Sequence, residues 1–227
     1  MLVVLVAFYY NIRLMRTRWY ILITIWLALL ATCMVWIDQP VKQFFFDHQF
    51  HLPSSGLMKD TIWTESIQAL GCYPTIIGIV FVLIVLTKLS WRDGLVILIV
   101  SAVGGLNEGF KWIFGRSRPV ANDGSLTGPW DFIPFGMRDT GMAFPSGHTM
   151  LAFATATCLA RYYPRWVWLC YFLAALVAVE RVLEVAHHVS DVIAAAGLGI
   201  ILSTVVMNLL NRQKQRTETP ALEMVNT

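Results

Sequence analysis

Apolar residues are concentrated in six long runs along the chain, and short polar stretches separate these runs. They occupy approximately Trp19 to Ile37, Cys72 to Thr87, Gly94 to Phe114, His148 to Tyr163, Trp166 to Leu183 and Val192 to Leu210. Sustained apolar character over such lengths is typical of helices that cross a bilayer, although the second and fourth runs are short for a crossing. The pattern predicts an all-α polytopic membrane protein with a six-transmembrane-helix bundle.

The composition supports this prediction, since 57% of the 227 residues are hydrophobic and only 14% are charged. The mean hydropathy is +0.62, far from the balance of a water-soluble protein. The net charge of +3 is small, and we assign it to membrane-flanking cations and not to a nucleic-acid-binding face. The bilayer is therefore the expected partner, and no nucleic acid is expected.

Lysine and arginine are distributed unevenly between the two sides that six helices would create. One side receives Arg13, Arg16, Arg18, Lys88, Arg92, Arg161, Arg165, Arg212, Lys214 and Arg216. The other side receives Lys42, Lys59, Lys111, Arg116, Arg118, Arg138 and Arg181. By the positive-inside rule the first side is cytoplasmic, with both termini. We therefore expect a cytoplasmic N-terminal segment (1–18), a transmembrane domain (19–211) and a mobile cytoplasmic tail (212–227).

The first ten residues are apolar but too few to span, and no cation precedes them as it would in a signal peptide. We expect an interfacial segment there, or a start site upstream of the native one.

Three polar motifs lie at the ends of apolar runs and carry the candidate chemistry. They are Lys111 to Pro119 (KWIFGRSRP), Pro145 to His148 (PSGH) and Arg181 to Asp191 (RVLEVAHHVSD). An up-and-down path places all three on the same, non-cytoplasmic side of the membrane. The topology therefore predicts that they form one site.

The first motif offers two cations, Lys111 and Arg118, about two helical turns apart if the helix continues, with Pro119 ending it. Arginine binds a phosphate through a planar fork and lysine as a compact charge, although cations at helix ends also commonly snorkel to the interface. Either Glu108 or Asn107 could hold Lys111 in position from the preceding turn.

The second motif places Ser146 and Gly147 before a helix that begins near His148. Helix N-termini expose unpaired N–H groups, and glycine allows an anion to approach them closely. An ordinary serine cap would explain the same residues, but it does not account for a titratable histidine beside the cradle.

In the third motif, His187 and Asp191 are four residues apart, which would place them on one face of a helix. A carboxylate there fixes the tautomer of the imidazole and leaves its other nitrogen free for attack. The adjacent His188 has no acid four residues on, so His187 is the preferred nucleophile. Glu184 and His187 also have the Glu-x-x-His spacing of di-iron bundles, but no second such motif follows, so no metal is predicted and Glu184 is expected to pair with Arg181.

The ordered set K-x6-R-P, P-S-G-H and R-x5-H-x3-D resembles the signature of the type 2 phosphatidic acid phosphatase superfamily, over about half of the chain. One position departs from that pattern, because Glu180 stands where the family often has serine before the arginine. The resemblance implies a phosphatase without a cofactor, working through a phosphohistidine in a bacterial inner membrane with a periplasmic active site.

The resemblance also implies a role for each motif residue. His187 would attack phosphorus, Asp191 would orient it, and His148 would protonate the leaving oxygen and later activate water. The phosphoryl oxygens would be held by Lys111, Arg118, Arg181, Ser146 and Gly147. Phosphoryl transfer depends mainly on such positioning and charge stabilisation.

A site at the membrane surface favours a phosphate carried by a membrane lipid. Undecaprenyl diphosphate, phosphatidate, phosphatidylglycerol phosphate and lipid A 1-phosphate all stay open, and the aromatic loop from Val120 to Ala143 is expected to border the headgroup. A lipid phosphotransferase that uses the same phosphohistidine is the main alternative, and a non-catalytic anionic-lipid binder is a further one. The sequence does not predict an oligomeric state.

Overall fold

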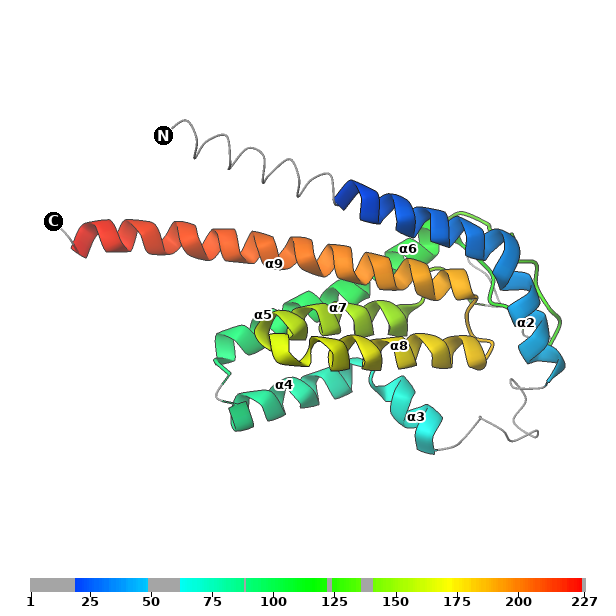
Figure 1. Ribbon diagram of the computed structural model, residues 1–227, viewed down its shortest axis with the longest axis horizontal. Helices are drawn as coiled ribbons and strands as arrows, with labels where there is room; N and C mark the ends of the chain where they lie inside the picture. Colours follow the sequence, from blue (N-terminus) through cyan, green and yellow to red (C-terminus); the bar gives the residue numbers. More distant parts are fainter. Residues whose placement is uncertain (1–18, 49–61, 88, 122–123, 136–140, 226–227) are drawn as a thin grey trace.

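The computed structural model describes residues 19–48, 62–87, 89–121, 124–135 and 141–225. In these ranges the chain is helical, and its extended segments form only isolated bridges, such as that between Ser117 and Met142. Figure 1 shows the helices running roughly parallel to one long axis. The all-α prediction is confirmed for the described residues.

The first helix continues well beyond its predicted end at Ile37. The helical stretch Trp19–Asp47 includes a π-helical turn, η1 (Cys33–Ile37), followed by α2 (Asp38–Asp47). Pro40 lies inside this continuous helix and has no N–H to donate to the preceding turn, and the π-helical turn directly before it is the kind of irregularity expected where the helical hydrogen bonding is interrupted. This extension, α2, begins with Asp38 and lies at the same end of the molecule as the end of α8 and the start of α9 (Figure 1).

The next apolar runs form α3 (Ile62–Ala69), which was not predicted, and α4 (Tyr73–Thr87). The predicted helix from Gly94 to Phe114 is divided into α5 (Trp91–Ala102), the 3-10 turn η2 (Val103–Leu106) and α6 (Asn107–Phe114). The break coincides with a close approach, because a Cβ on Gly104 would lie 3.0 Å from Leu151.

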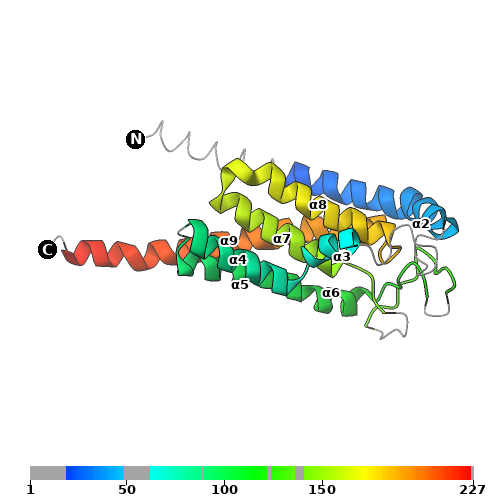
Figure 2. The ribbon, with the colours of Figure 1, turned by 90° about the horizontal axis from the view of Figure 1, so that it is seen from below.

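The C-terminal half forms α7 (Gly147–Tyr162), η3 (Pro164–Trp166), α8 (Val167–Leu183) and α9 (Val189–Val225). The last helix was expected to end near Leu210, and its backbone instead stays helical through the polar residues up to Val225. Figure 2 shows α7 surrounded by other helices, and it packs against α9, α8 and α5.

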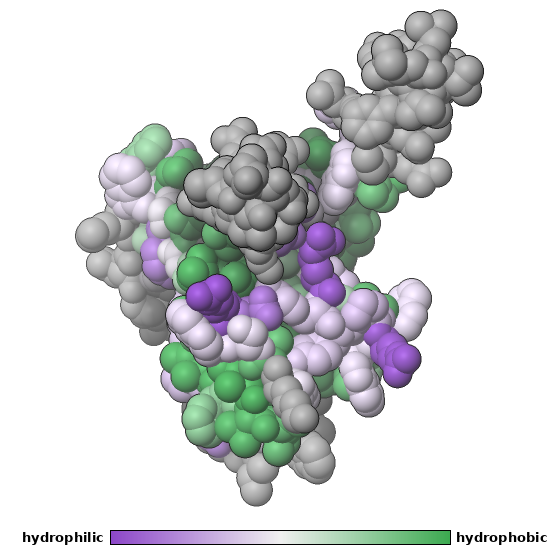
Figure 3. All heavy atoms as spheres, turned by 90° about the vertical axis from the view of Figure 1, so that its left-hand side faces the viewer, coloured by the Kyte–Doolittle hydropathy of each residue, from purple (hydrophilic) through white to green (hydrophobic). Residues whose placement is uncertain are grey.

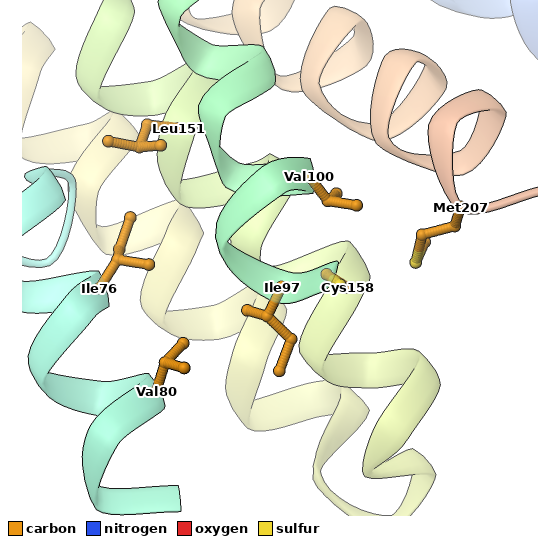
Figure 4. Close-up of a cluster of buried hydrophobic side chains, with 7 residues drawn as sticks. All are labelled: Ile76, Val80, Ile97, Val100, Leu151, Cys158 and Met207. Atoms are coloured by element: carbon orange, nitrogen blue, oxygen red, sulfur yellow. The ribbon is translucent and has the colours of Figure 1, made fainter. Parts of the chain in front are cut away.

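The main apolar cluster is formed by side chains from α4, α5, α7 and α9. Figure 4 shows its buried members, which are Ile76, Val80, Ile97, Val100, Leu151, Cys158 and Met207. Packing of this kind fixes the helices that present the motifs relative to one another.

Four helices in the described part of the chain are long and apolar enough to cross a membrane: Trp19–Asp47, Trp91–Phe114, Pro164–Leu183 and Val189–Asn211. The remaining two predicted crossings, α4 and α7, are shorter, so the predicted count of six is not established by length and composition. The connections α4–α5 and α7–α8 lie at one end of the molecule, and the ends of α2, α6 and α8 lie at the other (Figure 1). Figure 3 views the first of these ends, where hydrophilic side chains lie between apolar surfaces. Arg92, Arg161 and Arg165, which lie in sequence near the α4–α5 and α7–α8 connections, are exposed.

Candidate active site

The first motif leaves its helix earlier than predicted. Helix α6 ends at Phe114, and Gly115 follows in the left-handed conformation with φ 58°. A Cβ on Gly115 would lie 1.8 Å from the carbonyl oxygen of Ile133, so only glycine fits at this close approach. The helix is therefore ended by Gly115 and not by Pro119, and Lys111 and Arg118 do not share a helix.

Lys111 is held by Glu108, one of the two residues predicted to position it. Its Nζ lies 2.8 Å from Oε1 of Glu108, one turn earlier on α6. Asn107, the other proposed holder, is buried, and among the described residues neither its amide nitrogen nor its amide oxygen has a hydrogen-bond partner. Its amide nitrogen would lie 2.9 Å from a Cβ on Gly147, so the amide faces the start of α7.

The second motif begins α7, with Ser146 as the capping residue and Gly147 as the first helical residue. The Ser146 N–H donates to the carbonyl oxygen of Asp191 at 3.3 Å, and its Oγ accepts from Thr149 at 3.1 Å. Ser146 is completely buried. The main chain therefore joins the second motif directly to the third.

The third motif differs from its prediction, because α9 begins only at Val189 and His187 precedes it in a turn. Val185 has φ 54°, and the N–H groups of Ala186 and His187 both donate to the carbonyl oxygen of Arg181 at 3.2 Å. This turn still brings Nδ1 of His187 to 3.7 Å from Oδ2 of Asp191. That separation is too long for a hydrogen bond, and Nδ1 has no other partner among the described residues.

His188, the rival of His187, points to a different place. Its backbone N–H donates to Oδ2 of Asp191 at 2.8 Å, while its buried ring borders a small void beside Asp38 and Lys42. Burial, the largest effect, lowers the pKa of the His188 ring to about 4, so the ring is neutral at ordinary pH. His188 thus helps to position Asp191 and does not face the main cavity.

Arg181 is paired with two acids at the end of α8. Its Nε donates to Glu180 Oε2 at 2.5 Å, its Nη2 donates to the other oxygen of Glu180, and Nη2 lies 2.5 Å from Glu184 Oε2. The predicted pairing with Glu184 is confirmed. Glu180, the residue that departs from the family pattern, provides a second and bidentate partner.

One cavity of about 420 Å³ collects most of the predicted site residues. Its lining includes Lys111, Arg118, Gly147, His148, Arg181 and His187. Ser146 and Asp191 lie behind this lining and are completely buried. The pKa of His187 is lowered, chiefly by burial and further by Arg118 and Arg181, while Asp191 opposes the shift. The cavity therefore combines three cations with a neutral imidazole.

Sequence reasoning missed a buried ionic network behind Asp191. Arg116 Nη1 donates to Asp191 Oδ1 at 2.5 Å, and its Nη2 donates to Asp38 Oδ2 at 2.7 Å. All three side chains are completely buried. The sequence presents Arg116 only as one of the cations of the first motif, and the local pattern contains no signal for a partner 78 residues away.

The loop from Val120 to Ala143 contributes none of its described residues to the cavity lining. Phe132 instead packs beneath Arg116, with the guanidinium carbon 5.2 Å from the ring centroid. Trp130 and Phe135 are exposed. In the described segments this loop supports the arginines, and the prediction that it borders a headgroup stays untested.

The described residues contain no group of three or more His, Cys, Asp or Glu side chains that could hold a metal ion. Glu184, which shares the Glu-x-x-His spacing with His187, is engaged with Arg181.

Comparison with known proteins identifies related phosphatases. A curated relative, the lipid A 1-phosphatase of Porphyromonas gingivalis, is 32% identical over 119 residues, which cover 50% of this chain but only 23% of the relative. The chain therefore matches about a quarter of that protein's length.

Two solved structures share the fold. The PAP2-type phosphatidylglycerolphosphate phosphatase of Bacillus subtilis is 22% identical, with a TM-score of 0.55 over 84% of this chain and 94% of that one. Aquifex aeolicus LpxE is 18% identical, with a TM-score of 0.56 over 76% of this chain and 95% of that one. The sequence profile of the PAP2 superfamily matches residues 92–215, more than half of the chain, and includes all three motifs. This chain belongs to the PAP2 superfamily.

Proposed function

We propose that the protein is a membrane phosphatase that releases phosphate from a phosphorylated membrane lipid through a phosphohistidine. The observation that carries the proposal is the convergence of Lys111, Arg118 and Arg181, from three separate segments, on one cavity that also contains His148 and His187. Three cations complement the charge on the three equatorial oxygens of a transferring phosphoryl group. A cavity that only bound anions would not need the two imidazoles.

In the first step, Nε2 of His187 attacks phosphorus, and the bond from phosphorus to the lipid oxygen breaks. The proton on Nδ1 faces Asp191, whose carboxylate balances the positive charge that develops on the ring. The negative charge of the bound phosphate favours the protonated form of His148, which gives its proton to the departing lipid oxygen. In the second step, the now neutral His148 takes a proton from water, and the resulting hydroxyl oxygen attacks phosphorus. The nitrogen–phosphorus bond breaks, which releases inorganic phosphate and restores neutral His187.

The distance of 3.7 Å between Nδ1 of His187 and Oδ2 of Asp191 is compatible with this role. Catalytic hydrogen bonds are often long in the empty site and shorten when substrate binds. The low pKa of His187 also keeps the attacking ring unprotonated.

The cavity wall favours a lipid substrate. Tyr73, Pro74, Gly104 and Leu151 add apolar or small surfaces to the lining. Leu106, next to this wall, is exposed on the outer surface of the helices. The relatives named for lipid A 1-phosphate and phosphatidylglycerol phosphate support a lipid phosphate as substrate.

We further propose that α4 and α7 also cross the membrane, which gives six crossings, cytoplasmic termini and a periplasmic cavity. Helices α4 and α7 contain 15 and 16 residues, so each extends about 22 to 24 Å against a hydrocarbon core of about 30 Å. Helix α7 is surrounded by protein, so it does not need the apolar outer face of a lipid-facing helix (Figure 2). Labelling of single cysteines in the α4–α5 and α8–α9 connections with a membrane-impermeant maleimide tests this, since opposite accessibility is expected.

The function is tested by measuring phosphate release from detergent-solubilised protein with a panel of lipid monophosphates and diphosphates, in EDTA. We expect release from at least one lipid, loss of release in His187→Gln, and full release in His48→Gln, which alters an exposed histidine at the C-terminal end of α2 that is not part of the cavity lining. Release from no lipid, or normal release by His187→Gln, would refute the proposal. Loss of activity in EDTA would refute its metal-free form, and phosphate transfer to an added alcohol without free phosphate would identify a phosphotransferase.

A further inference from the structure

Asp38 lies outside residues 92–215, the part of the chain that matches the superfamily, yet it reaches the catalytic segment. It is 1% exposed on α2. Its Oδ1 accepts from the backbone N–H of Ser190 at 2.9 Å, and its Oδ2 accepts from the Ser190 hydroxyl at 2.5 Å. A carboxylate in this position caps the first turn of α9, where Asp191 lies, and opposes the positive end of the helix dipole.

Arg116 connects Asp38 to Asp191. Its Nη2 donates to Asp38, its Nη1 donates to both Asp191 and the Ser190 hydroxyl, and its Nε donates to the carbonyl oxygen of Pro129 at 3.1 Å. All three nitrogens of the guanidinium are therefore engaged. A planar fork with this many contacts has little freedom to rotate, so it fixes the carboxylates that it bonds.

The orientation of Asp191 follows from these contacts and not from His187. Oδ1 is held by Arg116 at 2.5 Å, and Oδ2 is held by the His188 N–H at 2.8 Å. The second of these oxygens is the one that faces Nδ1 of His187, at 3.7 Å. The charge of Arg116 is shared between two carboxylates, which leaves Asp191 more negative than a single ion pair would.

We infer that Asp38 is a positioning residue for the reaction: through Arg116 and Ser190 it sets the orientation and the negative charge of Asp191 toward His187. This inference rests on the proposed phosphohistidine mechanism. Asp38 contacts neither the cavity nor the phosphate, so its removal changes the chemical step and not substrate binding. The N-terminal helix is then part of the catalytic apparatus as well as a membrane anchor.

Asp38→Asn tests the inference, because asparagine keeps the shape of the side chain but has one acceptor oxygen, whereas both oxygens of Asp38 accept hydrogen bonds. Loss of a charge-assisted hydrogen bond of the kind that Asp38 makes corresponds to a rate about ten- to a hundredfold lower when that bond supports a reacting group. We expect kcat to fall by that factor with KM unchanged. Asp47→Asn is the matched control, since it makes the same change at an exposed position of the same helix and should leave kcat unchanged.

The pH profile separates positioning from simple loss of folded protein. His187 is faced by Asp191 from α9, by Arg181 from α8, by His148 from α7 and by Arg118 from the segment after α6. Loss of the Asp38 charge makes these surroundings more positive, so the acidic limb of the kcat/KM profile should move to lower pH in Asp38→Asn. Arg116→Lys keeps the positive charge but loses the planar, multidentate guanidinium. It should therefore lower kcat and leave the pH of the acidic limb of the kcat/KM profile unchanged.

If Asp38→Asn does not fold, Ser190→Ala provides the test, because it keeps all charges and removes only the hydroxyl between Asp38 and Arg116. One hydrogen bond of about 1 kcal/mol corresponds to a kcat about fivefold lower. A normal kcat in the folded variant, or a lower rate with an unmoved limb in Asp38→Asn, would overturn the inference. Failure of the wild-type protein to release phosphate would instead overturn the proposed function.

Discussion

Replacement of Glu180 by glutamine should lower the stability of the phosphate-free protein and raise its affinity for phosphate. Glu180 is 3% exposed and Arg181 is 5% exposed, and the two are joined by a bidentate ion pair. Glutamine preserves the size of the side chain and removes its charge. Arg181 would then keep Glu184, 2.5 Å away, as its acidic partner.

The size of the effect follows from this residual pairing. Breaking a buried ion pair at one partner costs about 3–5 kcal/mol, and Glu184 keeps the loss near 3 kcal/mol. A loss of that size lowers the unfolding midpoint of a chain of this length by about 6–12 °C. Phosphate no longer competes with a carboxylate for Nε of Arg181, so its affinity should rise about tenfold, which adds about 1.4 kcal/mol of stabilisation at saturation.

Thermal unfolding in detergent, with and without inorganic phosphate, measures both effects. We expect a lower midpoint without phosphate and a larger rise on adding it than in the wild-type protein. Glu65→Gln, at an exposed position of α3, is the control and should change neither quantity. An unchanged midpoint, or a phosphate-induced rise no larger than that of the wild type, would refute the reasoning.

Three further predictions concern the cavity and its supports. Because burial lowers the pKa of His187, kcat/KM should stay level as the pH falls to about 6.5, the usual imidazole value, and decline only below it; a decline that begins above that value would contradict the assignment. Asn107→Leu removes the unpaired amide at the cavity wall, so KM should rise about tenfold without loss of thermal stability, and an unchanged KM would show that Asn107 does not contact substrate. Gly115→Ala should destabilise the protein by more than the roughly 1–2 kcal/mol that a left-handed alanine costs, since its Cβ also meets the Ile133 carbonyl. Gly109→Ala has open space around it and should not destabilise the protein in this way. Equal unfolding midpoints for the two variants would contradict this prediction.

The parts of the site that depend on local spacing could be predicted from the sequence. Lys111 with Glu108, and Arg181 with Glu184, are pairs three residues apart, and both form ion pairs in the structure. The apolar runs likewise located the helices that carry the motifs. Short-range periodicity contains this information because neighbouring turns of a helix must meet.

The failures have a common physical origin in contacts between distant segments. The left-handed Gly115 ends its helix because the Ile133 carbonyl comes so close, and the Val185 turn places His187 outside α9. The partner of Arg116 lies on a helix that the apolar pattern ended too early, at Ile37. No local pattern contains such a contact, since it forms only when the helices pack.

The hydrogen bond from the Ser146 N–H to the Asp191 carbonyl has a consequence for how the proposed enzyme can diversify. It joins the starts of α7 and α9 by main-chain atoms alone, so side-chain replacements elsewhere leave their spacing unchanged. Another part of the cavity wall is made by the turn before α4 and by the break between α5 and α6. Within that part of the wall, Gly71 and Gly104 pack closely against His148 and Leu151 of α7, so Tyr73 and Pro74 are the positions to vary when another lipid specificity is sought while the reacting groups stay in place.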